Sequence, residues 1–192
     1  EKNIPVGAGL GGGSADSAAV LRYFQKKYKI EIPKNEMIAQ IGADVPVCLS
    51  EKFQRVRGIG EITEEIYENN FELWIVLVNP RVNVSTGKIF QSLKETDNKG
   101  LESFEGFKTS KDFIKYLLRQ RNDLQSVACE KYPEIKCVLD EILETKSNLL
   151  ARMTGSGSTC FGLYSKMEDA LRAQKNMTEK FKSWWVKYSK VF

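Results

Sequence analysis

Glycine dominates a short stretch near the start of the chain and limits what that stretch can become. Five of the seven residues from Gly7 to Gly13 are glycine, and the stretch follows Pro5. Glycine adopts positive φ without steric cost, so such a segment can turn sharply and bring its N–H groups close to another group. A helix or strand running through it would be destabilised. We therefore expect a glycine-rich loop over residues 5–13.

An amphipathic helix is predicted directly after this loop. Between Ser14 and Tyr28, apolar residues recur every three or four positions, which is the spacing of one helix face: Ala18, Leu21, Phe24 and Tyr28. Asp16 falls in the expected first turn, and Lys26 and Lys27 fall in the last, as the helix dipole favours. A helix start offers unpaired N–H groups and partial positive charge, so loop and helix together suit a phosphate group.

Two known types of phosphate-binding loop can be compared with this one. A P-loop needs Gly-Lys followed by Ser or Thr, and the one Gly-Lys pair here continues with Ile89. Gly7, Gly9 and Gly12, with Glu31 further on, match the spacing of a dinucleotide fingerprint. That fingerprint also requires an apolar strand before its first glycine, where this chain has a proline. A dinucleotide-binding oxidoreductase is therefore the less favoured alternative.

The composition of the 192 residues excludes several classes of protein. The chain has no histidine, so Ser–His–Asp sites, Cys–His sites and His-ligated zinc are excluded. Its net charge of +4 is spread along the sequence, which suits a small polyanion better than a nucleic-acid duplex. The apolar run Leu73 to Val78 is far shorter than the ~20 residues of a membrane helix. We expect neither a nucleic-acid nor a membrane partner.

The cysteines indicate the compartment. The four of them form no C-x-x-C pair: Cys48, Cys129, Cys137 and Cys160. Neither a metal site nor a disulfide framework is therefore indicated, and ordinary thiols belong to a reducing cytoplasm. The sequence shows no signal-peptide pattern. We expect a cytoplasmic protein.

The rest of the chain predicts an α+β architecture. The unalternated run from Leu73 to Val78 predicts a strand covered on both faces. Asn35 is expected to cap a short helix that Gly42 ends. The polar residues at 64–71 mark a domain boundary, which gives domains of 1–66 and 67–192.

Further elements follow from periodicity and from end signals. A capping box of Ser165 and Glu168 is expected to start a helix that runs to about Lys182. Short strands are expected on both sides of the glycine cluster at 155–157. The remaining expected helices cover 86–93, 111–120, 123–131 and 133–145, and a last strand covers 184–191.

Several motifs, taken in order, resemble a known kinase superfamily. Pro5 and Gly9-Leu10-Gly11-Gly12-Gly13-Ser14 lead into an Ala-rich helix, Gly42-Ala43-Asp44-Val45-Pro46 follows, and Thr154-Gly155-Ser156-Gly157-Ser158 lies near the C-terminus. This order resembles the GHMP small-molecule kinases. Within them, the sequence is most similar to the family that phosphorylates 4-diphosphocytidyl-2-C-methyl-D-erythritol. Shorter patterns agree with that family: Arg57-Gly58-x-Gly60-Glu61, Val84-Ser85-Thr86 and Asn122-Asp123-Leu124.

The resemblance implies both a fold and an activity. The fold would be the GHMP kinase fold, with a partial ribosomal protein S5 domain 2-like N-terminal part over 1–66 and a ferredoxin-like C-terminal domain over 67–192. The activity would be ATP-dependent phosphorylation of the 2-hydroxyl of 4-diphosphocytidyl-2-C-methyl-D-erythritol, a step of non-mevalonate isoprenoid biosynthesis. ATP and Mg²⁺ would be the cofactors. The protein would act on a small molecule as a monomer or weak homodimer.

The resemblance also implies which residues bind the nucleotide. The ATP phosphates would be held by Pro5, Gly7, Gly9, Leu10, Gly11, Gly12, Gly13 and Ser14. Valine in place of Gly12 is expected to weaken ATP binding, in part because a β-branched residue resists positive φ. Gly155, Ser156 and Gly157 would pack against this loop and shape the active site. The alternative is a tight hairpin turn without further function.

Three further side chains are candidates. Phosphoryl transfer needs a group that orients or deprotonates the hydroxyl, and the resemblance gives this role to Asp44. The alternative is an Asx turn or helix cap before Val45-Pro46. Thr86 and Phe90, four apart and so on one helix face, would line the methylerythritol pocket and stack on cytosine. The alternative for them is a cap and a core aromatic, and no metal ligand can be assigned.

The resemblance leaves part of the family pattern unassigned. Members of the family begin with a further N-terminal segment that supplies the first strands, a catalytic lysine, and a tyrosine and a histidine that hold the cytidine. This sequence starts at Glu1, directly before the glycine loop. The alternative function is therefore a catalytically incomplete nucleotide-binding fragment of such a kinase.

Overall fold

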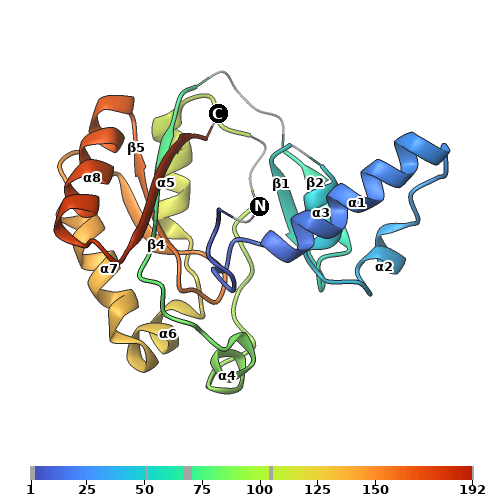
Figure 1. Ribbon diagram of the computed structural model, residues 1–192, viewed down its shortest axis with the longest axis horizontal. Helices are drawn as coiled ribbons and strands as arrows, with labels where there is room; N and C mark the ends of the chain where they lie inside the picture. Colours follow the sequence, from blue (N-terminus) through green and yellow to red (C-terminus); the bar gives the residue numbers. More distant parts are fainter. Residues whose placement is uncertain (1–2, 51, 67–70, 104–105, 192) are drawn as a thin grey trace. The chain divides into compact units, whose positions relative to one another are not determined.

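The computed structural model describes residues 3–50, 52–66, 71–103 and 106–191 (Figure 1). These residues form two compact units. One unit contains the described residues up to Leu10 and those from Phe71 onward, and the other runs from Gly11 to Ile66. The domain assignment of 1–66 and 67–192 stays a prediction about the family pattern.

The unit from Gly11 to Ile66 is small and mostly helical. Its elements are α1 (Gly12–Tyr28), α2 (Asn35–Ile38), α3 (Val45–Leu49), β1 (Gln54–Arg57) and β2 (Ile62–Glu65). Its core is formed by Ala18, Ile38 and Val45, which are almost fully buried. The two strands pair as an antiparallel hairpin with Gln54 opposite Glu65. The sequence analysis predicted no strand in this charged segment.

Three local predictions in this unit are wrong. Helix α1 starts at Gly12 rather than Ser14, so Asp16 lies outside its first turn. Helix α2 ends at Ile38 rather than at Gly42, and its N-cap is Lys34. The Asn35 side chain donates to the carbonyl oxygen of Glu61 at 3.3 Å instead of capping the helix. A contact distant in sequence therefore displaces the local cap.

The other unit is built on a four-stranded antiparallel sheet. Its strands are β3 (Trp74–Asn79), β4 (Leu150–Met153), β5 (Cys160–Tyr164) and β6 (Trp185–Lys190), in the order β4-β5-β3-β6. Two connections each cross over one intervening strand: the one from β3 to β4 and the one from β5 to β6. Together with the strand order, they define a ferredoxin-like sheet. The three strands expected near residues 73, 149 and 159 are confirmed, as is the last one.

Helices cover both faces of this sheet (Figure 1). The helices of this unit are α4 (Thr86–Gln91), α5 (Ser110–Arg119), α6 (Gln125–Lys131), α7 (Pro133–Leu143) and α8 (Met167–Lys180). Of these, α7 and α8 lie on one face of the sheet and α5 lies on the other. Val76 and Val78 of β3 pack with residues of α7 and α8, whereas Leu73 and Ile75 pack with residues of α5. The prediction that this strand is covered on both faces is confirmed.

The helix ends in this unit follow the sequence signals only in part. Thr109 caps α5, because its Oγ1 accepts a hydrogen bond from the Asp112 N–H at 3.2 Å. The capping box expected at Ser165 is wrong: Lys166 is the N-cap of α8, and its side chain makes no capping bond. Among the described residues, no helix has both the length and the apolar character needed to cross a membrane.

The core between α7 and the sheet yields the first prediction. Ile142 is fully buried, and a Cβ added at Gly162 of β5 would lie 2.6 Å from its Cγ2. Ile142→Ala should lower the free energy of unfolding by about 2–5 kcal/mol, because it leaves a cavity against the sheet. The neighbouring Leu143 is 60% exposed, so Leu143→Ala should cost less than about 0.5 kcal/mol. Urea denaturation measures both, and equal losses would contradict this packing.

Candidate active site

The first part of the glycine loop lies against the loop that joins β4 to β5. Gly7 and Gly9 have φ of 67° and 70°. A Cβ added at Gly9 would lie 2.6 Å from the carbonyl oxygen of Gly157 and 2.8 Å from that of Thr154. Thr154 Oγ1 donates to the Gly9 carbonyl at 2.9 Å, and the Thr159 N–H donates to the Ala8 carbonyl at 3.2 Å. No side chain larger than hydrogen fits at position 9.

The second part of the loop becomes the start of α1. Gly11 is its N-cap in the left-handed conformation, and no side chain caps the helix. The first intrahelical bond runs from the Ala15 N–H to the Gly11 carbonyl at 2.8 Å. In the part of the chain that the structure describes, the N–H groups of residues 12–14 have no acceptor. Three amides at the positive end of the helix are therefore open to an anion.

The backbone conformation of Gly12 differs from the positive φ that the sequence analysis expected there. Its φ is not in the left-handed region, because it already belongs to the helix. A Cβ added at Gly12 or at Gly13 would meet no atom within 4 Å. The argument that valine at position 12 would be strained by positive φ is therefore wrong. Any effect of that substitution on ligand binding must come from the added bulk.

Asp44 stands at the N-cap position of α3. Its carboxylate is exposed, makes no capping bond, and has no hydrogen bond or ion pair with any described residue. Burial raises the pKa of the nearby Cys48 thiol, and the negative charge of Asp44 raises it further. The structural alternative required a hydrogen bond from the cap, which Asp44 does not make. The carboxylate is therefore free to accept a proton or a hydrogen bond from a ligand.

The backbone around Asp44 is held firmly. Val45 is buried against α1, and Arg22 Nη1 donates to the Cys48 carbonyl at 2.8 Å at the far end of α3. Gly60, in the turn between β1 and β2, has φ of 118°, and any Cβ there would collide with the carbonyl oxygen of Ala43. The glycine therefore lets the hairpin turn approach the residue next to Asp44.

Thr86 and Phe90 share one exposed face of α4. Phe90 is 55% exposed, while its neighbour Ile89 is buried and anchors the helix. The alternative that Phe90 is a core aromatic is therefore wrong. The hydroxyl groups of Thr86 and Ser156 share a hydrogen bond of 2.8 Å. The structure thus joins the predicted substrate residue to the predicted shaping loop.

The structure gives a role to two residues to which the sequence assigned none. Asn79 and Asn122 each donate hydrogen bonds to the β4–β5 connection, residues 153–159. The available signal was the position of Asn79, a polar residue at the end of an apolar strand. Its partners are almost 80 positions further along the chain, so sequence alone could not identify them.

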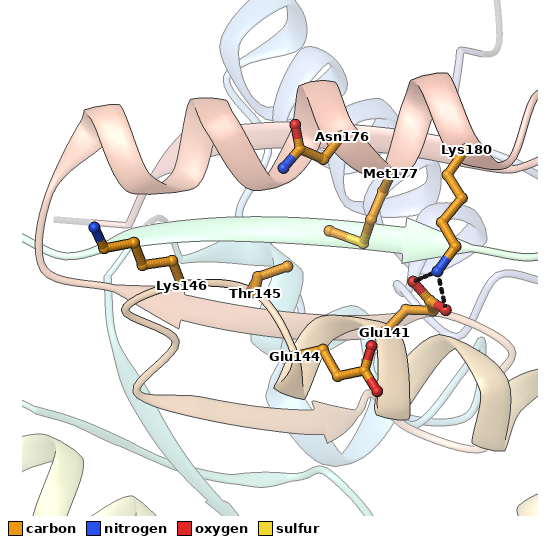
Figure 2. A pocket seen from close by; sticks show the side chains of 7 residues that line it. All are labelled: Glu141, Glu144, Thr145, Lys146, Asn176, Met177 and Lys180. Carbon is orange, nitrogen blue, oxygen red and sulfur yellow. Dashed lines mark hydrogen bonds and ion pairs between the residues drawn. The ribbon is translucent and has the colours of Figure 1, made fainter.

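A surface hollow lies elsewhere on the same unit, between the end of α7 and α8 (Figure 2). Its volume is about 380 Å³, and it is lined by Glu141, Glu144, Thr145, Lys146, Asn176, Met177 and Lys180. Lys180 Nζ contacts both carboxylate oxygens of Glu141 at 2.7 Å, as the dashed lines show. No residue that the sequence singled out lines this hollow, so it is separate from the candidate site.

Known protein families and individual proteins match this chain in sequence. The family described as GHMP kinases N terminal domain matches residues 1–52, and the family described as GHMP kinases C terminal matches residues 105–183. A 4-diphosphocytidyl-2-C-methyl-D-erythritol kinase of Cereibacter sphaeroides is 38% identical over 97% of this chain and 67% of the relative. One of Wolbachia sp. subsp. Brugia malayi is 42% identical over 96% of this chain and 64% of the relative.

A solved structure agrees with these relatives. The crystal structure of a 4-(cytidine 5'-diphospho)-2C-methyl-D-erythritol kinase matches with a TM-score of 0.76 and 29% identity, over 98% of this chain and 68% of that one. The fold and the family matches define a GHMP kinase. Within that superfamily the chain belongs to the 4-diphosphocytidyl-2-C-methyl-D-erythritol kinase family, of whose members it spans about two thirds. The fold class and family expected from the sequence are confirmed.

The glycine loop generates the second prediction. Gly9→Ala should destabilise the protein by about 1–3 kcal/mol, because alanine would be strained at this φ and would press on two carbonyl oxygens. Gly12→Ala, in open space at the helix start, should be neutral or should stabilise by about 0.4–1 kcal/mol. Thermal unfolding of the two variants measures the difference. Equal melting temperatures would contradict the close approach at Gly9.

Proposed function

We propose that this protein catalyses ATP-dependent phosphorylation of the 2-hydroxyl of 4-diphosphocytidyl-2-C-methyl-D-erythritol. The observation that carries the proposal is the 38% identity with a kinase of that name over 97% of the chain. The candidate site supports it independently, since it presents open amides for phosphate and a free carboxylate for an alcohol. This reaction belongs to non-mevalonate isoprenoid precursor biosynthesis.

The glycine loop binds the ATP phosphates in this proposal. The loop runs from Pro5 to Ser14, and every residue after Pro5 carries a backbone N–H group; those of residues 12–14 are open at the positive end of α1. Phosphate oxygens complete the hydrogen bonds that the helix start lacks. The positive φ of Gly7, Gly9 and Gly11 shapes the backbone that leads into this helix. Side chains play little part in this binding.

Mg²⁺ fits as an ion that arrives with the nucleotide. Among the described residues, no group of three or more Cys, Asp or Glu side chains could hold a metal. Mg²⁺ commonly binds through one or two carboxylates together with substrate phosphates, and a donor set of few carboxylates agrees with that. When bound, the ion neutralises charge on the phosphates.

Asp44 acts on the acceptor alcohol. Its exposed carboxylate accepts the proton of the 2-hydroxyl as the oxygen attacks the terminal phosphorus of ATP. The bond from that phosphorus to the bridging oxygen breaks, and ADP leaves with the bridging oxygen. Burial of Val45 and the close approach of Gly60 hold the backbone on which it stands. Fixed geometry of this kind favours catalysis because the base need not be ordered during the reaction.

Thr86 and Phe90 bind the acceptor. The Thr86 hydroxyl, oriented by Ser156, hydrogen-bonds to the methylerythritol part, and the exposed Phe90 ring stacks on the cytosine. Stacking of a base on an aromatic ring contributes about 1–3 kcal/mol. Gly155 and Gly157 shape the loop that carries Ser156.

The cysteines and the charge distribution bear on the compartment and the partners of the protein. The four cysteines are free thiols, which fits a reducing cytoplasm. The spread of its charges fits a small-molecule substrate and no nucleic acid. We place it in the cytoplasm as a monomer or weak homodimer.

A dinucleotide-binding oxidoreductase is disfavoured by the structure. That fold requires a strand before the first glycine and another that ends at the acid. Residues 3–6 and the segment around Glu31 lie outside the strands of the described chain. The G-x-G-x-x-G spacing is thus present without its structural context.

The third prediction tests the nucleotide and the reaction together. Calorimetric titration should show binding of ATP·Mg and none of NADH, because the amides at the start of α1 suit a triphosphate. Incubation with ATP and 4-diphosphocytidyl-2-C-methyl-D-erythritol should release ADP, with homoserine as the control acceptor. Binding of NADH alone would contradict the kinase assignment. Binding of ATP without turnover would instead support the catalytically incomplete fragment.

The fourth prediction concerns Asp44. Asp44→Asn should lower kcat by about 10²–10⁴-fold, because it removes the base but preserves the shape of the side chain. The free energy of unfolding should change by less than about 1 kcal/mol, since the side chain makes no capping bond.

Asp97→Asn, in an exposed loop, is the matched control and should change neither quantity. Steady-state kinetics and thermal unfolding measure both variants. If Asp44→Asn unfolds the protein while its folded fraction turns over normally, Asp44 is a structural residue.

A further inference from the structure

A buried asparagine holds one end of the β4–β5 connection. Asn79, the last residue of β3, is 1% exposed. Its Nδ2 donates to Ser158 Oγ at 3.1 Å and to Thr159 Oγ1 at 2.9 Å. Its Oδ1 accepts a hydrogen bond from the Arg81 N–H at 2.7 Å. One carboxamide therefore joins the end of the central strand to the end of the loop.

The same asparagine fixes the chain that leads to α4. The backbone at Arg81 has a φ of 61°, which is unfavourable for a residue other than glycine, and the hydrogen bond from its N–H to Asn79 stabilises this turn. Ser158 Oγ donates in turn to the Val82 carbonyl at 2.7 Å. Thr86 starts α4 four residues later. The loop and the segment before Thr86 are thus tied to one buried group.

A second asparagine holds the other end of the loop. Asn122 Nδ2 donates to the carbonyl oxygens of Met153 at 2.9 Å and Gly155 at 2.8 Å. Its Oδ1 accepts from the Leu124 N–H at 3.0 Å, just before α6. The loop is therefore held at both ends, by the last residue of β3 and by a residue of the connection between α5 and α6.

The loop residues that Asn79 and Asn122 hold in place contact two parts of the candidate site. Ser156 shares a hydrogen bond with Thr86, and Thr154 donates to the Gly9 carbonyl. The Thr159 N–H donates to the Ala8 carbonyl. A shift of the loop would therefore move both the predicted acceptor residue and the glycine segment that precedes α1.

We propose that Asn79 and Asn122 are positioning residues of the kinase: they clamp residues 153–159 and so set the place of Ser156, Thr86 and the Ala8–Gly9 backbone. This inference rests on the proposed function. Neither side chain contacts the reacting groups. Both act through the loop, because a displacement of about 1 Å in binding groups can cost up to about 100-fold in rate.

The fifth prediction compares Asn79→Ala and Asn122→Ala with a matched control. Asn148 also donates to a backbone carbonyl, that of Leu150 at 3.1 Å, but it precedes β4 at the end opposite the loop. Asn148→Ala should therefore cost stability and leave the loop in place. Measurements on folded protein should show kcat/KM for the acceptor falling about 10–100-fold in the two clamp variants, mostly through KM, and unchanged in the control.

Hydrogen exchange reports on the loop without requiring activity. The Gly157 N–H donates to the Thr154 carbonyl at 3.0 Å, and the Thr159 N–H donates to Ala8. In both clamp variants these amides should exchange at least about tenfold faster, while amides of the central strand β3 keep their protection. A double-mutant cycle adds a further test. On a Thr86→Ala background, Asn79→Ala should cost less in kcat/KM than in the parent protein, because the two act through one path.

The outcomes separate the clamp from the proposed function. Faster exchange at 157 and 159 together with the rise in KM supports the positioning role. A lower melting temperature with unchanged kinetics of the folded fraction overturns it, and so does additive behaviour of Asn79→Ala and Thr86→Ala. If the parent protein transfers no phosphate to the acceptor, the proposed function fails. Exchange then decides the clamp: unchanged protection at 157 and 159 overturns it, and loss of protection supports it.

Discussion

The close approach of two backbones at Gly9 is the constraint on which the candidate site depends. Two carbonyl oxygens of the β4–β5 connection lie where the Cβ of any other residue would stand, and a threonine hydroxyl closes the contact. That connection joins the paired strands β4 and β5, and β5 also pairs with β3, so its place is set by the sheet. The sheet is in turn fixed by apolar residues packed on both faces. Ordinary core packing thus determines where the glycine segment before α1 runs.

In the smaller unit, a glycine likewise allows a close backbone contact beside the candidate residue Asp44. Gly60 brings a hairpin turn against the Ala43 carbonyl, and the buried Val45 holds the following turn of helix. Asp44, between them, has a fixed backbone and a carboxylate that no described residue binds. In both units a glycine contributes by letting backbone meet backbone, and neither contributes a functional group of its own. This explains why the chain has a glycine at position 60, away from the predicted phosphate contacts.

The sequence predicted elements whose pattern is local and missed those that depend on distant partners. The apolar run in β3 was sufficient, because burial imposes it on the sequence. The period of α1 predicted a helix, although of its apolar residues Ala18 is buried while Phe24 and Tyr28 are exposed. The β1–β2 hairpin is exposed on most of both faces and shows no such pattern, and charged side chains such as Arg57 and Glu64 form an ion pair between its strands. The expected cap at Asn35 failed because its side chain donates a hydrogen bond to Glu61, a residue of the β1–β2 turn 26 positions later. Asp44 and the glycine loop came from motif resemblance, whereas Asn79 could be found only from the structure.

Hydrogen bonding separates the groups that stabilise this fold from those available to a ligand. Among the described residues, every buried side-chain nitrogen and oxygen has a partner, including the buried Asn79, Ser158 and Thr159. Unpaired polar groups in a core would cost about 1–3 kcal/mol each, so selection for stability accounts for this pairing. The amides at the start of α1 and the carboxylate of Asp44 are exposed to water and carry no such cost. The polar groups that this fold leaves open to a ligand therefore lie on its surface, and the proposed function assigns the N–H groups at the start of α1 to the ATP phosphates.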